Sequence, residues 1–260
     1  MPLIVNADDF GYSDEINGAI AECFARGYCA STSIMANMPG FEAACAIAHR
    51  DGLLDRVGVH LVLTEGEPLT QPIRQCPRFC DSSGRFCLTR KQRVWRLSKS
   101  EKAAVAEELQ AQVTRCRTFG LPLAHADTHQ HVHEEWGILP VVIDVCQREG
   151  IRQIRIARNC GTSSGPARTL YRRLVNHAIQ RSGLMRTDLF GSWQDFRVVA
   201  RTSPGMLIDH SIEIMIHPRY SAQRDILDET PPHPPVCLQV VAAQIGILPA
   251  QDMRRPAHLR

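Results

Sequence analysis

The chain has 260 residues, of which 44% are hydrophobic and 22% charged, with 17 Gly and 16 Pro. This composition excludes a disordered or low-complexity chain, and the length suffices for a stable core without disulfides. A formal net charge of +3 is too small to predict a nucleic-acid partner. No apolar run approaches the ~18 residues that a membrane span needs, so we expect no membrane span.

Short β-branched runs along the chain predict strands, and several of these runs end in an acid or a histidine. They occupy residues 3–5, 57–59, 123–126, 151–156 and 212–216. Such runs, buried on both faces and separated by helical patterns, are typical of a mostly parallel sheet.

Three capped patterns between these runs predict helices. They span 13–27, 98–120 and 166–183. Ser13 and Ser98 are suited to cap the first two, and Ser98 and Glu101 have the spacing of a capping box. In the third helix we expect Leu170, Leu174 and Ile179 to face the core.

This alternation predicts an α/β fold in one domain spanning residues 1–260, with its ligand site at the carboxyl ends of the strands. No Gly-x-Gly-x-x-Gly or Walker motif is present, so we expect no nucleotide cofactor. Residues 64–100 are rich in Pro, Arg, Cys and Gly and lack firm periodicity. We expect this segment to form a lid beside the site.

The N-terminal residues and the cysteines predict a cytoplasmic protein. The chain begins Met-Pro-Leu-Ile-Val-Asn-Ala-Asp-Asp, with acids where a signal peptide needs an apolar core. Cys76, Cys80 and Cys87 are the closest cysteine group, but no Cys-x-x-Cys occurs, which disfavours a structural zinc site. We expect reduced thiols, with Cys23, Cys45, Cys116 and Cys146 packed as small hydrophobes.

Asp8 and Asp9 are adjacent acids at the end of the first predicted strand. Neighbouring side chains on a strand point in opposite directions, so an extended chain directs only one of them at a ligand. A turn beginning at Phe10 and Gly11 would bring both to the site. Alternatively, one caps the helix that begins near Ser13 while the other is solvated.

The segment Asp127-Thr128-His129-Gln130-His131-Val132-His133 is the most specific signal in the sequence. Its ionisable residues alternate, which places them ~7 Å apart on one face of an extended segment. Metal–ligand bonds are only ~2 Å long, so one ion binds at most one or two of these histidines. The others support the site or contact substrate, unless the segment is an ordinary surface loop.

Two further histidines follow predicted strands. His60, a carboxylate and one histidine of the 129–133 cluster would form a two-imidazole, one-carboxylate metal site with open positions, as in hydrolytic or oxygenase centres. His217 is a candidate proton donor. The alternative for each is a histidine that only packs or caps at a strand end.

At these residues the sequence resembles the YdjC-like carbohydrate deacetylases, which include chitooligosaccharide deacetylases and hopanoid-associated members. Ordered motifs carry the resemblance from the N-terminus to about residue 220. They are Asn6-Ala7-Asp8-Asp9-Phe10-Gly11, Ser31-Thr32-Ser33, Val57-Gly58-Val59-His60-Leu61-Val62-Leu63-Thr64, the 127–133 segment, and Glu213-Ile214-Met215-Ile216-His217-Pro218.

The resemblance implies an irregular (β/α) barrel similar to other polysaccharide deacetylases, and the hydrolysis of an acetamide on an N-acetylated carbohydrate to acetate and an amino sugar. It implies one divalent cation, Mg²⁺ or Zn²⁺, bound by Asp9, His60 and His129. By the same resemblance Asp8 is the general base and His217 the general acid.

Four further residues receive supporting roles from the resemblance. Asp127 would orient a ligand or the base, and Arg155 would hold part of the site or the sugar. His131 and His133 would contact substrate or support the ligands.

Two departures from the family pattern bear on these expectations. Arg219 stands where the family usually has Gly, and Arg adopts positive φ less easily. The tail after about residue 225 diverges, which affects the rear wall of the substrate pocket and leaves a homodimer open. Two alternatives therefore remain: another metal-dependent hydrolase, acting on a phosphoester or a cyclic amide, and a degenerate, non-catalytic relative that binds sugar or metal.

Overall fold

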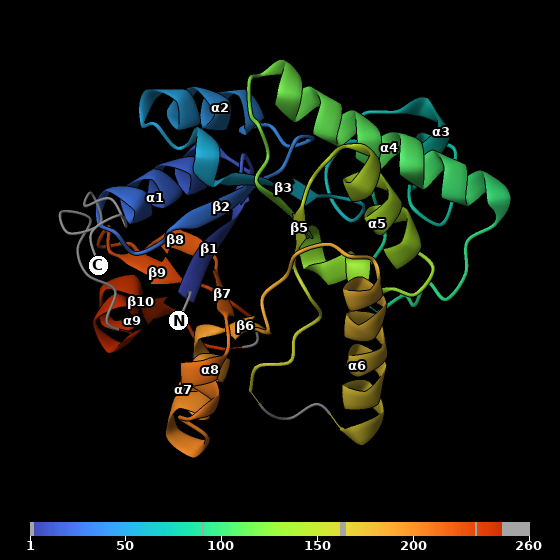
Figure 1. Cartoon of the computed structure of the whole chain (residues 1–260). Coiled ribbons are helices and arrows are strands. Elements are labelled where there is room, and N and C mark those ends of the chain that lie inside the picture. The colour runs from blue at the N-terminus through green and yellow to red at the C-terminus, as the bar shows by residue number, and fades with distance from the viewer. Residues whose placement is uncertain (1–2, 90, 162–164, 232, 246–260) are drawn as a thin grey trace.

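A curled sheet of parallel strands forms the centre of the computed structural model, which describes residues 3–89, 91–161, 165–231 and 233–245. The strand order is β5-β4-β3-β2-β1-β7-β6, and neighbouring strands are parallel throughout. Figure 1 shows helices around this sheet. The strands are β1 (Leu3–Phe10), β2 (Ser31–Ile34), β3 (Val57–Leu61), β4 (His125–Thr128), β5 (Gln153–Ile154), β6 (Leu189–Ser192) and β7 (Ile212–Ile216).

Chain segments beyond β5 join the two edges of the sheet. Gln153 forms an isolated parallel bridge with Met185. The backbone N–H groups of Asn159 and Cys160 donate to the carbonyl oxygen of Phe190 in β6, at 3.1 and 2.9 Å. The sheet is therefore an incompletely closed, irregular barrel, which confirms the predicted fold class.

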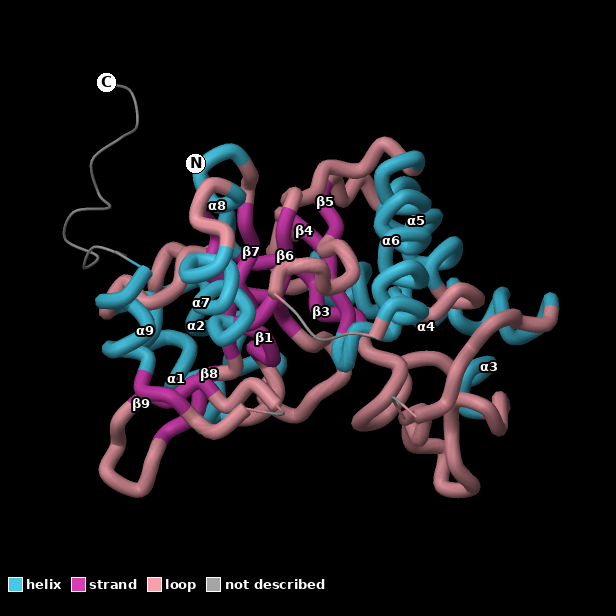
Figure 2. The backbone as a smooth tube through the Cα atoms, turned by 90° about the horizontal axis from the view of Figure 1, so that it is seen from below, coloured by secondary structure: helices cyan, strands magenta, loops and turns pink. Residues whose placement is uncertain are grey.

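Figure 2, a view turned by 90° from that of Figure 1, shows that the helices lie outside the strands. They are α1 (Asp14–Ala25), α2 (Phe41–Arg50), α3 (Gln71–Arg74), α4 (Lys99–Thr118), α5 (Leu139–Arg148), α6 (Pro166–Arg181), α7 (Trp193–Thr202), α8 (Met206–Asp209) and α9 (Leu238–Ile245), with 3₁₀ turns η1 (Leu54–Arg56) and η2 (His129–Glu134). The predicted caps are confirmed: Ser13 accepts from the backbone N–H of Ile16, and Ser98 and Glu101 form a capping box.

Two expectations about local structure are only partly confirmed. The run at 151–156 does form a strand, but this strand, β5, is only two residues long. On α6, Leu170 and Leu174 are 59% and 51% exposed, whereas Val175 and Ile179 are buried. The helix packs along a narrow stripe with four-residue spacing, and Leu174 lies one position, about 100°, away from that stripe. Apolar identity alone does not distinguish these two registers.

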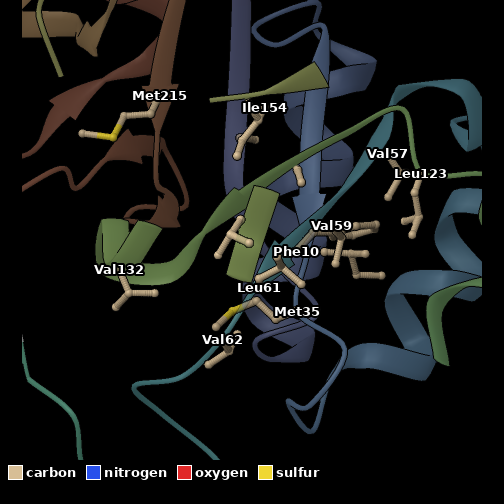
Figure 3. Close-up of a cluster of buried hydrophobic side chains, with 14 of the residues drawn as sticks. Phe10, Met35, Val57, Val59, Leu61, Val62, Leu123, Val132, Ile154 and Met215 are labelled. Carbon is tan, nitrogen blue, oxygen red and sulfur yellow. The ribbon is translucent and has the colours of Figure 1, made fainter. Parts of the chain in front are cut away.

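Buried aliphatic and aromatic side chains fill the space between sheet and helices. Figure 3 shows part of this core, in which Phe10, Val59 and Leu61 gather beside Met35 and Val62. The four cysteines predicted to pack as small hydrophobes, Cys23, Cys45, Cys116 and Cys146, are buried free thiols. Burial raises the pKa of Cys116, as expected for a thiol without a partner for its charged form.

A second, antiparallel sheet was not predicted from the sequence. It follows β7 and consists of β8 (Pro218–Tyr220), β9 (Ile226–Asp228) and β10 (Val236–Cys237), with β9 in the middle. The divergent tail from about residue 225 thus supplies β9, β10 and α9, while its last part, 246–260, lies outside the described residues. Within the described ranges, none of the helices has the length and apolar character needed to cross a membrane.

Candidate metal and catalytic site

The carboxyl ends of neighbouring strands bring the predicted site residues together. Asp8 and Asp9 lie at the end of β1, His60 on β3 and Asp127 on β4, and His217 directly follows β7. Strands β3 and β4 pair with His60 opposite Asp127. This is the edge at which parallel α/β sheets place their ligands.

A left-handed residue in β1 turns both adjacent acids toward the site. Asp9 has a φ of 70°, and the register between β1 and β2 shifts between Ala7 and Phe10. The carbonyl of Asp9 accepts from the N–H of Tyr12 at 3.1 Å. Because Ser13 caps α1, neither acid serves as that cap. Positive φ outside glycine costs roughly 1–3 kcal/mol, and such strain is concentrated at functional sites.

Asp9, His60 and His129 present one oxygen and two ring nitrogens to a common point. Asp9 Oδ1 lies 3.4 Å from His60 Nε2 and 3.2 Å from His129 Nδ1. One ligand atom from each residue falls within 4.8 Å of the others. Asp9 Oδ1 is buried and has no hydrogen-bond partner among the described residues. An unsatisfied carboxylate oxygen between two imidazoles fits a divalent cation.

A carboxylate contacts the second ring nitrogen of each imidazole, the one that does not face Asp9, and so orients the ring. His60 Nδ1 lies 2.6 Å from Asp127 Oδ1, and His129 Nε2 lies 3.2 Å from Glu65 Oε2. The hydroxyl of Tyr12 donates to Glu65 Oε1 at 2.6 Å. A carboxylate on the second ring nitrogen is the usual support of a metal-binding histidine. The role of Asp127 is therefore consistent with the prediction, whereas Glu65 and Tyr12 were missed.

Arg155 lies fully buried among three carboxylates. Its Nη1 and Nη2 donate to Asp8 Oδ2 and Oδ1, both at 2.7 Å. Nη1 also lies 2.8 Å from Asp127 Oδ2, and Nε donates to Glu213 Oε1 at 2.6 Å. Asn6 donates to Asp8 Oδ1 at 2.8 Å. The Asp8 carboxylate is thus held in one orientation by three donated hydrogen bonds.

The charges of this cluster control the protonation of its members. Burial alone would raise the pKa of Asp127, but Arg155 and His60 outweigh burial and hold that pKa well below its usual range. Burial likewise opposes the ionisation of Asp9, yet His129 and His60 hold its pKa well below normal. Although burial favours neutral His60, Asp127 and Asp9 raise its pKa to about 10. The excess of buried negative charge favours a bound cation.

A second group, Asp8, His60 and Asp127, also has ligand atoms within 4.8 Å of one another. Arg155 already donates to both oxygens of Asp8 and contacts Asp127. A cation placed there would face that guanidinium. The Asp9 group is the better candidate because Asp9 Oδ1 accepts no hydrogen bond from the described residues, whereas Arg155 donates to both oxygens of Asp8.

His217 reaches the same site from β7. Its Nε2 lies 3.9 Å from Asp8 Oδ2, too far for a direct hydrogen bond but close enough for both groups to face one reacting molecule. The side chain is 21% exposed, so it is accessible from the cavity.

Arg219 lies in β8 without a positive φ, so the expected conflict between Arg and a glycine-like conformation does not arise. Its Nη2 lies 3.2 Å from Asp9 Oδ2. This contact leaves Oδ1 as the oxygen of Asp9 that faces the two imidazoles.

The other histidines of the 127–133 segment are divided between cavity and core. Gln130 and His131 have φ values of 54° and 58°, which break the extended geometry that an unbent strand would have. His131 lines the cavity. His133 is buried and its Nδ1 lies 2.6 Å from the hydroxyl of Thr128, so it supports the loop away from the Asp9 group.

A cavity of about 650 Å³ opens over these residues. Glu65, Thr89 and Lys91 of the 64–100 segment form part of its wall. The remaining lining includes Asp8, Asp9, Tyr12, His60, Thr128, His129, Gln130, His131, Arg158, Met215, His217, Arg219, Glu229, Thr230 and Pro231. A cavity of this size is typical of a site that binds a small molecule.

Known proteins match both the sequence and the fold. The family model described as YdjC-like protein matches residues 2–244. A carbohydrate deacetylase from Brevibacillus brevis is 41% identical over 147 residues, 56% of each chain. A carbohydrate deacetylase from Geobacillus stearothermophilus is 40% identical over 60% of each chain, so these two alignments span less than two thirds of the relatives.

Other matches are longer. A chitooligosaccharide deacetylase from Serratia marcescens is 31% identical over 232 residues, 84% of this chain and 81% of the relative. The crystal structure of a proposed cellobiose-phosphate cleavage protein from Enterococcus faecalis V583 superimposes with a TM-score of 0.66 at 20% identity, over 97% of this chain and 98% of the other. That structural likeness bears on the fold alone.

Proposed function

Because this chain belongs to the YdjC-like protein family, we propose that it is a metal-dependent carbohydrate deacetylase. It hydrolyses the acetamide of an N-acetylated sugar, such as an N-acetylglucosamine oligosaccharide or glycolipid, to an amino sugar and acetate. The observation that carries the proposal is the buried, unpartnered Asp9 Oδ1 beside ring nitrogens of His60 and His129.

Asp9, His60 and His129 would hold one divalent cation. Two imidazoles favour Zn²⁺ or another transition ion on grounds of softness, while Mg²⁺ is the alternative from the resemblance. When bound, the cation would lower the pKa of a bound water to near neutral and would polarise the acetamide carbonyl.

Asp8 and His217 would move the protons. Asp8 accepts the proton of the attacking water, and Arg155 and Asn6 fix the direction in which its carboxylate points. His217 donates its Nε2 proton to the amine nitrogen as the carbon–nitrogen bond breaks. The 3.9 Å between Asp8 Oδ2 and His217 Nε2 supports this assignment, because two groups that close can both face one reacting centre.

Residues around the cavity would bind the sugar. His131, Lys91 and Arg158 line its wall and present groups that hydrogen-bond hydroxyls. The 64–100 segment, which supplies Glu65, Thr89 and Lys91, would act as the lid of a single domain. All ten cysteines are free, which supports a reducing, cytoplasmic location.

The test is acetate release from N-acetylglucosamine oligomers by purified protein with added Zn²⁺, Mg²⁺ or Mn²⁺. We expect Asp8→Asn to lower turnover by about 10²–10⁴-fold while the metal stays bound. Asp51→Asn, which removes an exposed carboxylate paired with Arg50, is the matched control and keeps wild-type turnover. A folded, metal-loaded wild type that releases no acetate refutes the proposed function; undiminished turnover in Asp8→Asn refutes the assigned base.

A further inference from the structure

Two side chains at the end of β9 and just after it, Asp228 and Thr230, form a chain of hydrogen bonds to the ring of His217. His217 Nδ1 lies 2.9 Å from Thr230 Oγ1, and the hydroxyl of Thr230 donates to Asp228 Oδ1 at 2.6 Å. The backbone N–H of His217 donates to the same Asp228 oxygen at 2.9 Å. Asp228 and Thr230 are 0% and 1% exposed, so water does not compete for these hydrogen bonds.

The donors and acceptors along this chain of hydrogen bonds determine which ring nitrogen of His217 carries a proton. Asp228 Oδ1 is the acceptor of two hydrogen bonds, from the backbone N–H of His217 and from the hydroxyl of Thr230. The single hydroxyl proton of Thr230 therefore goes to Asp228. Thr230 Oγ1 can then only accept from His217, which places a proton on Nδ1 and turns Nε2 toward Asp8.

We propose that Thr230 and Asp228 are positioning residues that hold His217 in the Nδ1-protonated tautomer, with Nε2 presented to the reacting centre. This inference rests on the proposed function, in which His217 donates a proton from Nε2. After donation the ring is neutral and keeps its Nδ1–H on Thr230, so no proton moves through Thr230 or Asp228.

The backbone already provides the structural connection between these strands. Residues 218 and 228, and residues 220 and 226, are paired across β8 and β9, and the N–H of Glu229 donates to the carbonyl of His217 at 3.0 Å. Removing the hydroxyl of Thr230 leaves this ladder in place. The hydroxyl is therefore available for orienting the ring, and Thr230→Val tests that role at nearly constant side-chain shape.

The experiment compares wild type with Thr230→Val and Thr230→Ser on two substrates, diacetylchitobiose and 4-nitrophenyl acetate. We expect Thr230→Val to lower kcat on the acetamide by about tenfold to a hundredfold, with KM and metal content unchanged, because one hydrogen bond to a charged ring is lost. Thr230→Ser restores kcat. The nitrophenyl ester loses little, because its leaving group departs without protonation.

Thr202→Val is the matched control, since Thr202 is an exposed residue at the end of α7 whose hydroxyl donates to the carbonyl of Val198. It should leave both substrates unaffected. Equal losses on amide and ester in Thr230→Val would show a general structural defect and overturn the inference, as would wild-type kcat on the amide.

A second readout does not need activity. Nitrogen-15 NMR of labelled histidine distinguishes the two neutral tautomers, and the His217 signals are assigned by their loss in His217→Gln. We expect the Nδ1–H form in wild type and a shift toward Nε2–H in Thr230→Val. The Nε2–H form in wild type overturns the inference even if Thr230→Val does not fold. If the protein releases no acetate but His217 is in the Nδ1–H form, the proposed function is overturned while the inference about the tautomer stands.

Discussion

Replacing Arg155 by methionine should lower the free energy of unfolding, because buried carboxylates of the site lose their positively charged partner. The substitution keeps an unbranched side chain and removes the guanidinium that contacts Asp8, Asp127 and Glu213. All four side chains are at most 6% exposed, so water cannot replace the lost partner. Breaking a buried ion pair by removing one member costs about 3–5 kcal/mol, which we expect for the free energy of unfolding at pH 8.

The same substitution should change how stability depends on pH. In wild type the pKa of Asp127 is lowered, so its contribution to stability is present above its unfolded pKa of about 3.9 and is lost as pH falls through the folded value. Without Arg155, burial raises the pKa of Asp127 and Glu213, and stability is lost as pH rises. The difference between Arg155→Met and wild type is therefore larger at pH 8 than at pH 5.

Urea denaturation at both pH values, followed by the fluorescence of buried Trp193, measures this difference. Arg148→Met, which breaks an exposed pair with Asp144, is the control and should cost at most about 1 kcal/mol. A loss in Arg155→Met below about 1 kcal/mol, or one that is equal at pH 5 and pH 8, would refute the reasoning.

Three further outcomes are expected. His60→Ala and His129→Ala lower bound metal measured by elemental analysis, whereas His133→Ala does so much less; full occupancy in His129→Ala contradicts the ligand assignment. Burial lowers the pKa of His125, so the unfolded chain binds a proton at this residue more readily and the free energy of unfolding decreases as pH falls below about 6.5. His125→Phe should make the free energy of unfolding, measured by urea titration, depend less on pH in this range. An unchanged pH dependence argues against this role of His125. Leu109→Ala in α4 removes a fully buried side chain and should cost about 2–5 kcal/mol in the same assay, with a loss under 1 kcal/mol counting against the core described.

Local signals explain why much of the fold was predictable. The caps at Ser13 and Ser98 are encoded within four residues of each helix start and were confirmed. The small sheet was not predicted, because β8 to β10 are two or three residues long and pair only after the chain reverses. The face of α6 was misjudged because Leu174 and Val175 are both apolar and only packing selects between them.

The candidate site, too, was predictable where sequence signals are local and unpredictable where it depends on tertiary structure. The sequence placed Asp9, His60 and His129 at strand ends, and the parallel sheet brings those ends together. It did not predict the φ of 70° at Asp9, which depends on the local turn. Nor did it predict that Arg155 contacts Asp8, 147 residues away, because that distance is bridged only by tertiary structure.

The most direct test of metal-dependent deacetylation is a titration of metal-stripped protein with Zn²⁺ or Mg²⁺ while acetate release from diacetylchitobiose is recorded. We expect no release without metal, saturation at one ion per chain, and loss of both binding and release in Asp9→Asn. Full acetate release by the metal-free protein, or by Asp9→Asn without bound metal, would contradict it.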